Sequence, residues 1–145
     1  MLVLEFIAIL SATFFTGAAI YINLAEHPAR MECGTELAAT EFGPSYRRAA
    51  RMQASLALLA SITAIGAWFI GAPRAWFSGA VLIFAVVPFT LLAIMPINSR
   101  LLDPTLDRSS EAAHRLLQRW GSLHGVRSIL GLAASIVFLS SVIWS

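Results

Sequence analysis

Polar side chains able to do acid–base chemistry gather at two places in this 145-residue sequence, each at the edge of a long apolar run. In the first, residues 23–30, four of them recur at i, i+3, i+4 and i+7 and so share one helical face; they are Asn23, Glu26, His27 and Arg30. Pro28 predicts a kink or an end of the helix and leaves the Leu24 carbonyl without its usual donor. We expect either a polar pocket wall or a helix end among lipid headgroups.

The second place is the stretch 120–127, where Trp120, His124 and Arg127 fall at i, i+4 and i+7 and point the same way. Arg127 lies about two turns, roughly 10 Å, inside the apolar run that begins at Trp120. A charge at that depth usually faces a partner inside the bundle, for which Glu26 is the natural candidate. The alternative is that the long arginine stem snorkels to the interface.

A histidine base beside a cationic group suits the removal of an acidic proton and the stabilisation of the oxyanion that results. His27 or His124 is the candidate base for an activated C–H group or a phenol, and Arg127 would stabilise an enolate or phenolate. We assign catalytic roles to these three residues and to Glu26. Substrate contacts are assigned to the nearby amide and indole groups, which are Asn23, Asn98, Trp120 and Gln53. Asn98 has a second interpretation as a cap at a helix end.

The histidines and Glu26 also carry donors that bind transition metals, so a metal site on His27 and His124 remains an alternative. The sequence has no HxxxH or HExxH spacing to support such a site. It also has no phosphate-binding glycine loop, dinucleotide fingerprint or Ser-His-Asp arrangement. The single cysteine, Cys33, excludes an intrachain disulfide. We therefore predict no cofactor, with a transition metal as the alternative.

Four long apolar runs must position these side chains. Hydrophobic residues make up 58% of the sequence and charged residues 12%, a balance unlike that of a soluble domain. Runs of about 20 apolar residues span the hydrocarbon core of a bilayer, and the candidates are residues 2–25, 54–70, 75–97 and 120–144. The sequence therefore predicts an all-α integral membrane bundle of four transmembrane helices, with residues 1–145 forming one domain.

Arginine is distributed unevenly among the loops and indicates the orientation of the chain. Eight of the ten arginines flank the first and third loops, whereas the second loop holds Arg74 alone. The positive-inside rule predicts that loops one and three are cytoplasmic and that both termini lie outside the cytoplasmic membrane. We expect lipid and a lipophilic small molecule as partners, allow a homo-oligomer, and expect no nucleic acid. Three tryptophans are expected in an outer interfacial belt: Trp68, Trp76 and Trp144.

Proline and glycine predict where the helices begin and end. Residues 43–45, Gly-Pro-Ser, are expected to break the chain before the second span, after a short interfacial helix over 31–39. Residues 95–98 should close the third span, and Pro88 should loosen it midway. Residues 110–119 have helical spacing and lead into the fourth span, capped by one of Asp107, Ser109 or Ser110.

Three sequence runs occur in a characteristic order: EHPAR at 26–30, PINSRLL at 96–102 and WGSLHGVR at 120–127. Together they resemble the anthrone oxygenase-like family of small four-helix membrane proteins, and the resemblance covers nearly the whole chain. Some members of that family look like oxygenases that convert polyketide anthrones to anthraquinones with molecular oxygen and without an organic cofactor. The positions that the resemblance implies are His27, Asn98, Trp120, His124 and Arg127.

Two classes of function follow. The resemblance implies a membrane-embedded monooxygenase, an oxidoreductase acting on a lipophilic aromatic compound of the anthrone type. The alternative is a non-enzymatic membrane protein that binds a small apolar ligand or serves as an accessory subunit. His124→Ala and Arg127→Ala should abolish turnover in the first case and mainly lower thermal stability in the second. A transporter would require an oligomer, because four helices offer little room for a path.

Overall fold

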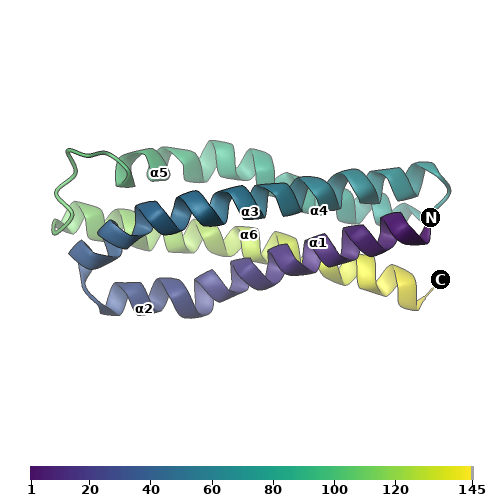
Figure 1. Cartoon of the computed structure of the whole chain (residues 1–145), viewed down its shortest axis with the longest axis horizontal. Helices are drawn as coiled ribbons and strands as arrows, with labels where there is room; N and C mark the ends of the chain where they lie inside the picture. The colour runs from purple at the N-terminus through teal and green to yellow at the C-terminus, as the bar shows by residue number, and fades with distance from the viewer. Residues whose placement is uncertain (145) are drawn as a thin grey trace.

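The computed structural model describes residues 1–144 as four long helical rods lying side by side (Figure 1). The first rod is α1 (Leu2–Tyr21), the π-helix η1 (Ile22–Glu26) and α2 (His27–Glu32), and the second is α3 (Thr35–Phe69). The third is α4 (Arg74–Phe89), the π-helix η2 (Thr90–Ile94) and α5 (Met95–Leu101), and the fourth is α6 (Glu111–Ile143). The described residues contain no strand, so the predicted all-α bundle of four helices is confirmed.

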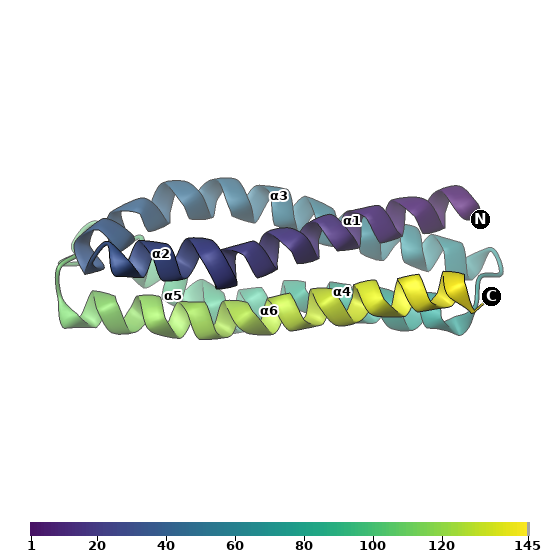
Figure 2. The ribbon, with the colours of Figure 1, turned by 90° about the horizontal axis from the view of Figure 1, so that it is seen from below.

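The rods alternate in direction and close into a ring. The first rod packs against α3 and α6, and α4 packs against the same two helices from the other side. Figures 1 and 2 place both termini at one end, together with the turn between α3 and α4. The other end carries the turn after α2 and the loop between α5 and α6; we call it the loop end.

All four rods are long and apolar enough to cross a membrane. The bundle interior near the termini is built mainly from alanine, with Trp76 and Phe138 stacked at 5.2 Å, whereas large apolar side chains cover the outside. Small residues inside and large ones outside are the arrangement that membrane bundles use, because lipid solvates the outer surface. The chain is therefore an integral membrane protein. Trp76 is 1% exposed, so its predicted place in an interfacial belt is wrong.

The rods extend beyond the hydrocarbon layer at the loop end. α6 has 33 residues, which corresponds to about 50 Å against a hydrocarbon thickness of about 30 Å. Its start is supported by Ser110, whose Oγ accepts from the Ala113 amide at 3.2 Å, as one of the predicted caps. Just before it, hydrogen bonds from the Ser109 side chain and backbone hold the pKa of Asp107 below its ordinary value.

The predicted break at residues 43–45 is wrong, because α3 runs without interruption from Thr35 to Phe69 with Pro44 inside it. Pro44 is exposed on the outer face, whereas Phe42 and Gly43 are buried against the rest of the bundle. Packing of this segment compensates for the one backbone hydrogen bond that proline removes. The chain turns earlier, at Gly34, whose φ of +93° is readily adopted by glycine. The short helix expected over 31–39 does not form.

The helices also continue through the prolines expected to end them. The first rod extends past Pro28 to Glu32, and the third extends past Pro96 to Leu101. In each case a five-residue π-helix comes first and the proline stands at the start of the next α-helix. A missing N–H costs least at such a position, so the π-helices let both rods run on.

Candidate functional site

The two polar stretches of the sequence meet inside the loop-end half of the bundle. They line a narrow cavity of about 20 Å³, which we call the inner cavity. The first rod contributes Glu26 and Arg30, α3 contributes Gln53, and α6 contributes His124 and Arg127. Tyr46 and Trp120 are among the aromatic groups of its wall, and Ser45, Ala49 and Ala50 complete the α3 side.

His124 is held in one orientation by Asn23 of η1. Its Nδ1 lies 2.7 Å from Asn23 Oδ1, while Asn23 Nδ2 donates to the Gly121 carbonyl at 3.0 Å. Ser128 also donates to Asn23 Oδ1, at 2.7 Å, so this oxygen acts as an acceptor. The geometry therefore assigns a proton to Nδ1, which in the neutral imidazole puts the lone pair on Nε2. With the side chain 1% exposed and lining the cavity, Nε2 is a candidate base.

His27 lies close to His124 but has different surroundings. The Trp120 ring contacts both imidazoles, at centroid distances of 5.2 Å to His27 and 4.8 Å to His124. His27 packs so tightly on Gly121 that an added Cβ there would lie 2.6 Å from its Nε2. It does not line the inner cavity. The geometry therefore favours His124 over His27 as the base and gives His27 a packing role.

Arg127 stands at the inner end of the cavity and is 8% exposed. Its Nη2 donates to Gln53 Oε1 at 2.7 Å, and its Cζ lies 5.7 Å from the centre of the Phe15 ring. No carboxylate among residues 1–144 forms an ion pair with it. A buried guanidinium without an anionic partner is costly, and it favours binding of a ligand that carries negative charge.

The expected ion pair between Glu26 and Arg127 does not form. Glu26 instead pairs with Arg30, one turn along the same rod, and accepts from Ser45 Oγ at 2.6 Å. Arg30 also reaches Glu41 of α3, with its Nε 3.0 Å from Oε2. The carboxylates of Glu26 and Glu41 therefore neutralise the positive charge of Arg30 at the cavity wall. The helical spacing placed Glu26 and Arg30 on one face, but a pair across helices depends on packing that the sequence does not display.

Asn98 joins the cluster from α5. Its Oδ1 accepts from Trp120 Nε1 at 2.9 Å, and the residue is 1% exposed. This contact places the Asn98 amide inside the polar cluster rather than at a helix end as a cap. Asn98 does not line the inner cavity, so it positions the indole. Sequence reasoning assigned no role to Ser45, Tyr46 or Ser128; each is a single hydroxyl without a distinctive local pattern.

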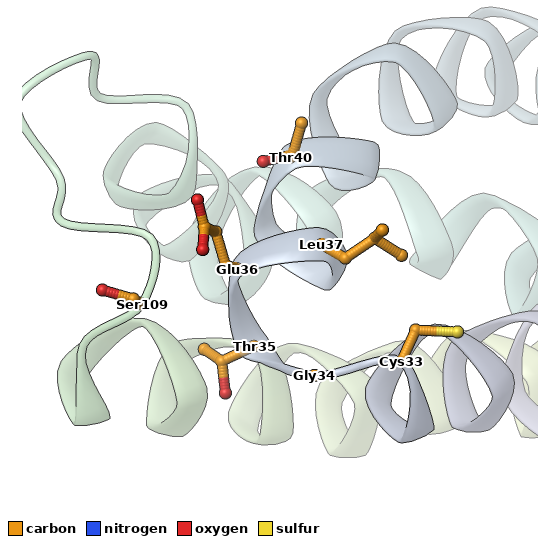
Figure 3. Close-up of a pocket in the computed structure, with 7 residues that line it drawn as sticks. All are labelled: Cys33, Gly34, Thr35, Glu36, Leu37, Thr40 and Ser109. Atoms are coloured by element: carbon orange, nitrogen blue, oxygen red, sulfur yellow. The ribbon is translucent and has the colours of Figure 1, made fainter.

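No three His, Cys, Asp or Glu side chains come together as a metal-binding group anywhere in residues 1–144. A larger hollow lies at the loop end, lined by Cys33, Gly34, Thr35, Glu36, Leu37, Thr40 and Ser109. Figure 3 shows that its side chains point in different directions rather than toward one point. It holds no imidazole and no guanidinium, so the inner cavity is the better candidate for chemistry.

Fold and site together define an integral membrane four-helix protein with a histidine and an arginine facing one small buried cavity. The chain belongs to the anthrone oxygenase family, whose model matches residues 42–137. The matched region includes Gln53, Asn98, Trp120, His124 and Arg127. Anthrone oxygenase tpcL of Aspergillus fumigatus is 28% identical over 147 residues, covering 94% of this chain and 91% of that protein. No solved structure matches the chain. Family membership supports an oxygenase-like role.

Proposed function

We propose that the protein oxidises an activated methylene group of a lipophilic, anthrone-type aromatic compound with molecular oxygen, using His124 as the base. One observation carries the proposal: His124, whose Nδ1 is bonded to Asn23, lines the same cavity as Arg127. A base and an unpaired cation in one apolar site suit the formation of an enolate. Membership of the anthrone oxygenase family gives independent support.

In the proposed reaction, His124 Nε2 takes one proton from the CH₂ group. The negative charge moves to the conjugated carbonyl oxygen, where Arg127 stabilises it. The carbanion then gives an electron to O₂, and the two radicals combine to form a peroxide anion at the same carbon. Protonated His124 returns its proton to this anion, which gives the hydroperoxide and restores the neutral base. Loss of water from the hydroperoxide leaves a ketone, so one oxygen atom enters the product and the other leaves as water. The electron-rich substrate is itself the reductant, and we propose no organic cofactor or metal.

The proposal is tested by oxygen uptake of the purified protein in lipid nanodiscs with dithranol, a model anthrone. We expect one O₂ consumed per dithranol converted to its anthraquinone. His124→Ala should lower the rate at least about 100-fold, because general base catalysis contributes factors of that order. Arg127→Gln should also lower the rate at least about 100-fold, as loss of an oxyanion-stabilising group does.

His114→Ala is the matched control, because His114 also lies on α6 but bonds to Thr35 away from the cavity, at 3.1 Å. It should retain the rate of the unmodified protein. Undiminished uptake in His124→Ala would overturn the assignment of the base. Lower melting temperatures in the cavity variants, with unchanged uptake, would instead favour a structural role in a non-enzymatic protein.

A further inference from the structure

A second cavity adjoins the inner cavity and opens toward the surrounding lipid. This outer cavity, of about 170 Å³, lies between α3 and the third rod. Ala54 of α3 and Leu91 of η2 stand on its rim, and both are exposed on the surface of the bundle. The two cavities share part of their walls, namely Tyr46, Ala50, Gln53 and Arg127. Arg127 therefore faces the site of chemistry and the lipid-side opening together.

The opening arises where the third rod changes from α to π geometry. Near the turn at residues 70–73, α3 and α4 pack closely through alanines, including Ala64, Ala67 and Ala80. Beyond Pro88 the third rod becomes η2 and then α5, and α5 has little contact with α3. In Figure 1 this part of the third rod runs beside α3 toward the loop end. α3 and the third rod pack less closely over η2, and the outer cavity is the space left between them.

The lining of the outer cavity selects a chemical class of ligand. Most of its wall is apolar, from residues such as Phe15, Ala57 and Val86. Its polar groups at the inner side are Gln53 and Arg127, whose Nε2 and Nε are buried without a hydrogen-bond partner in the described chain. Its volume is below the range of small-molecule sites, so an aromatic ligand can enter only if part of the wall moves. This lining suits a flat apolar molecule that carries one ionisable oxygen on the edge that enters first.

Tyr46 is one of the residues in the wall that the two cavities share, and its side chain is weakly held. Its ring stacks on Phe42 at 5.6 Å, and its hydroxyl makes one long contact, 3.8 Å to the sulfur of Met95. A thioether is a weak acceptor, so this contact resists movement of the ring only slightly. Met95 is itself on the exposed surface. A rotation of Tyr46 would join the outer cavity to the inner one without breaking a strong hydrogen bond.

We propose that the outer cavity is the route by which a lipophilic phenolic aromatic passes sideways from the bilayer to His124, with Tyr46 as the movable wall. This inference rests on the proposed function. A substrate dissolved in the membrane reaches the site without crossing water, and its oxygen meets Arg127 before its carbon meets His124. The route also keeps the reacting enolate away from the aqueous loop end.

The test is binding of emodin, a hydroxyanthraquinone that needs no turnover, measured by equilibrium dialysis against the full-length protein in lipid nanodiscs. Ala54→Trp places an indole in the rim of the outer cavity and should raise the dissociation constant at least about tenfold, a change equal to 1.4 kcal/mol. The neighbouring Ser55→Trp adds the same group at an exposed position that does not line the cavity. It should leave the constant unchanged.

The opposite rim gives a second matched pair. Leu91→Trp should weaken emodin binding as Ala54→Trp does, whereas Leu92→Trp, 80% exposed and outside the lining, should not. Equal affinities within both pairs would overturn the route. Oxygen uptake with dithranol together with such equal affinities would leave the oxygenase proposal intact. If the unmodified protein consumed no oxygen but Ala54→Trp and Leu91→Trp weakened emodin binding, the oxygenase function would be rejected and the outer cavity would stand as a ligand site.

Discussion

At the scale of single residues, the side-chain amide of Asn23 controls the chemistry available to His124. Its Nδ2 is committed to the Gly121 carbonyl, which orients the amide so that Oδ1 faces the imidazole. Ser128 strengthens this arrangement by donating to the same oxygen. An amide is suited to the task, because it accepts from Nδ1–H without adding a charge that would bind Arg127.

Asn23→Leu should remove the acceptor while keeping a side chain of similar size. The His124 ring then loses its preference for the tautomer with the lone pair on Nε2. Turnover of dithranol should fall about 10- to 100-fold, the range expected for loss of one buried hydrogen bond. Nitrogen-15 NMR of labelled histidine should show the Nδ1–H tautomer of His124 in the unmodified protein and a mixture in the variant.

Ser128→Ala is the control for that experiment, since it removes a donor to Asn23 but leaves the bond to His124. Its histidine spectrum should match that of the unmodified protein. A His124 signal with the proton on Nε2 in the unmodified protein would contradict the assignment of the base.

At the scale of elements, close helix approach places the imidazoles beside the indole. η1 and α2 lie against α6 at Gly121, where the absence of a side chain lets His27 pack on the helix backbone. The π-helix before His27 supports this approach, because it carries the rod past Pro28 without ending it. Trp120 is then enclosed by His27, His124 and Phe42.

Gly121→Ala tests this packing. The new Cβ would lie 2.6 Å from His27 Nε2, so the imidazole or the helix must shift. We expect a loss of about 1–3 kcal/mol in the free energy of unfolding, as overpacking in a core typically costs. Thermal melting in nanodiscs measures it.

Gly17→Ala provides the comparison, because Gly17 is also helical and an added Cβ there meets nothing within 4 Å. It should be neutral or stabilise by up to about 1 kcal/mol through helix propensity. Equal melting temperatures for the two variants would show that α6 and the first rod are not in close contact at Gly121.

At the scale of the whole molecule, charge separates the two ends of the bundle. Seven of the ten arginines lie in the loop-end half of the bundle, Arg51 and Arg127 lie near the middle of their helices, and Arg74 follows the turn at the end that carries the termini. By the positive-inside rule we propose that the loop end is cytoplasmic. The inner cavity would then lie on the cytoplasmic side of the bundle.

Cys33 makes this orientation testable, because it is the single cysteine and is exposed at the loop end. A membrane-impermeant maleimide should label it only after the cells are permeabilised. In a Cys33→Ser background, Arg74→Cys should be labelled in intact cells. The reverse pattern would place the loop end outside and contradict the proposed orientation.

The sequence by itself determined the class of protein and indicated most of the charged and imidazole groups of the candidate site. Hydropathy located four spans, and helical spacing grouped Glu26 with Arg30 and His124 with Arg127, because both signals depend only on neighbouring residues along one helix. Arginine distribution likewise indicated two ends of different character. These features follow from local geometry and from the preference of each side chain for lipid or water.

The tertiary structure alone decided which groups meet. His124 bonds to Asn23 from 101 positions away, Arg127 bonds to Gln53 from 74 positions away, and the expected partner Glu26 remains on its own rod. The rotation of each rod about its axis and its shift along its neighbours set such contacts. Helical periodicity specifies neither quantity, because it describes one helix at a time. The same limit explains why the sequence did not predict that α3 continues through Pro44. The helix is stabilised there by packing between rods, which the local sequence does not display.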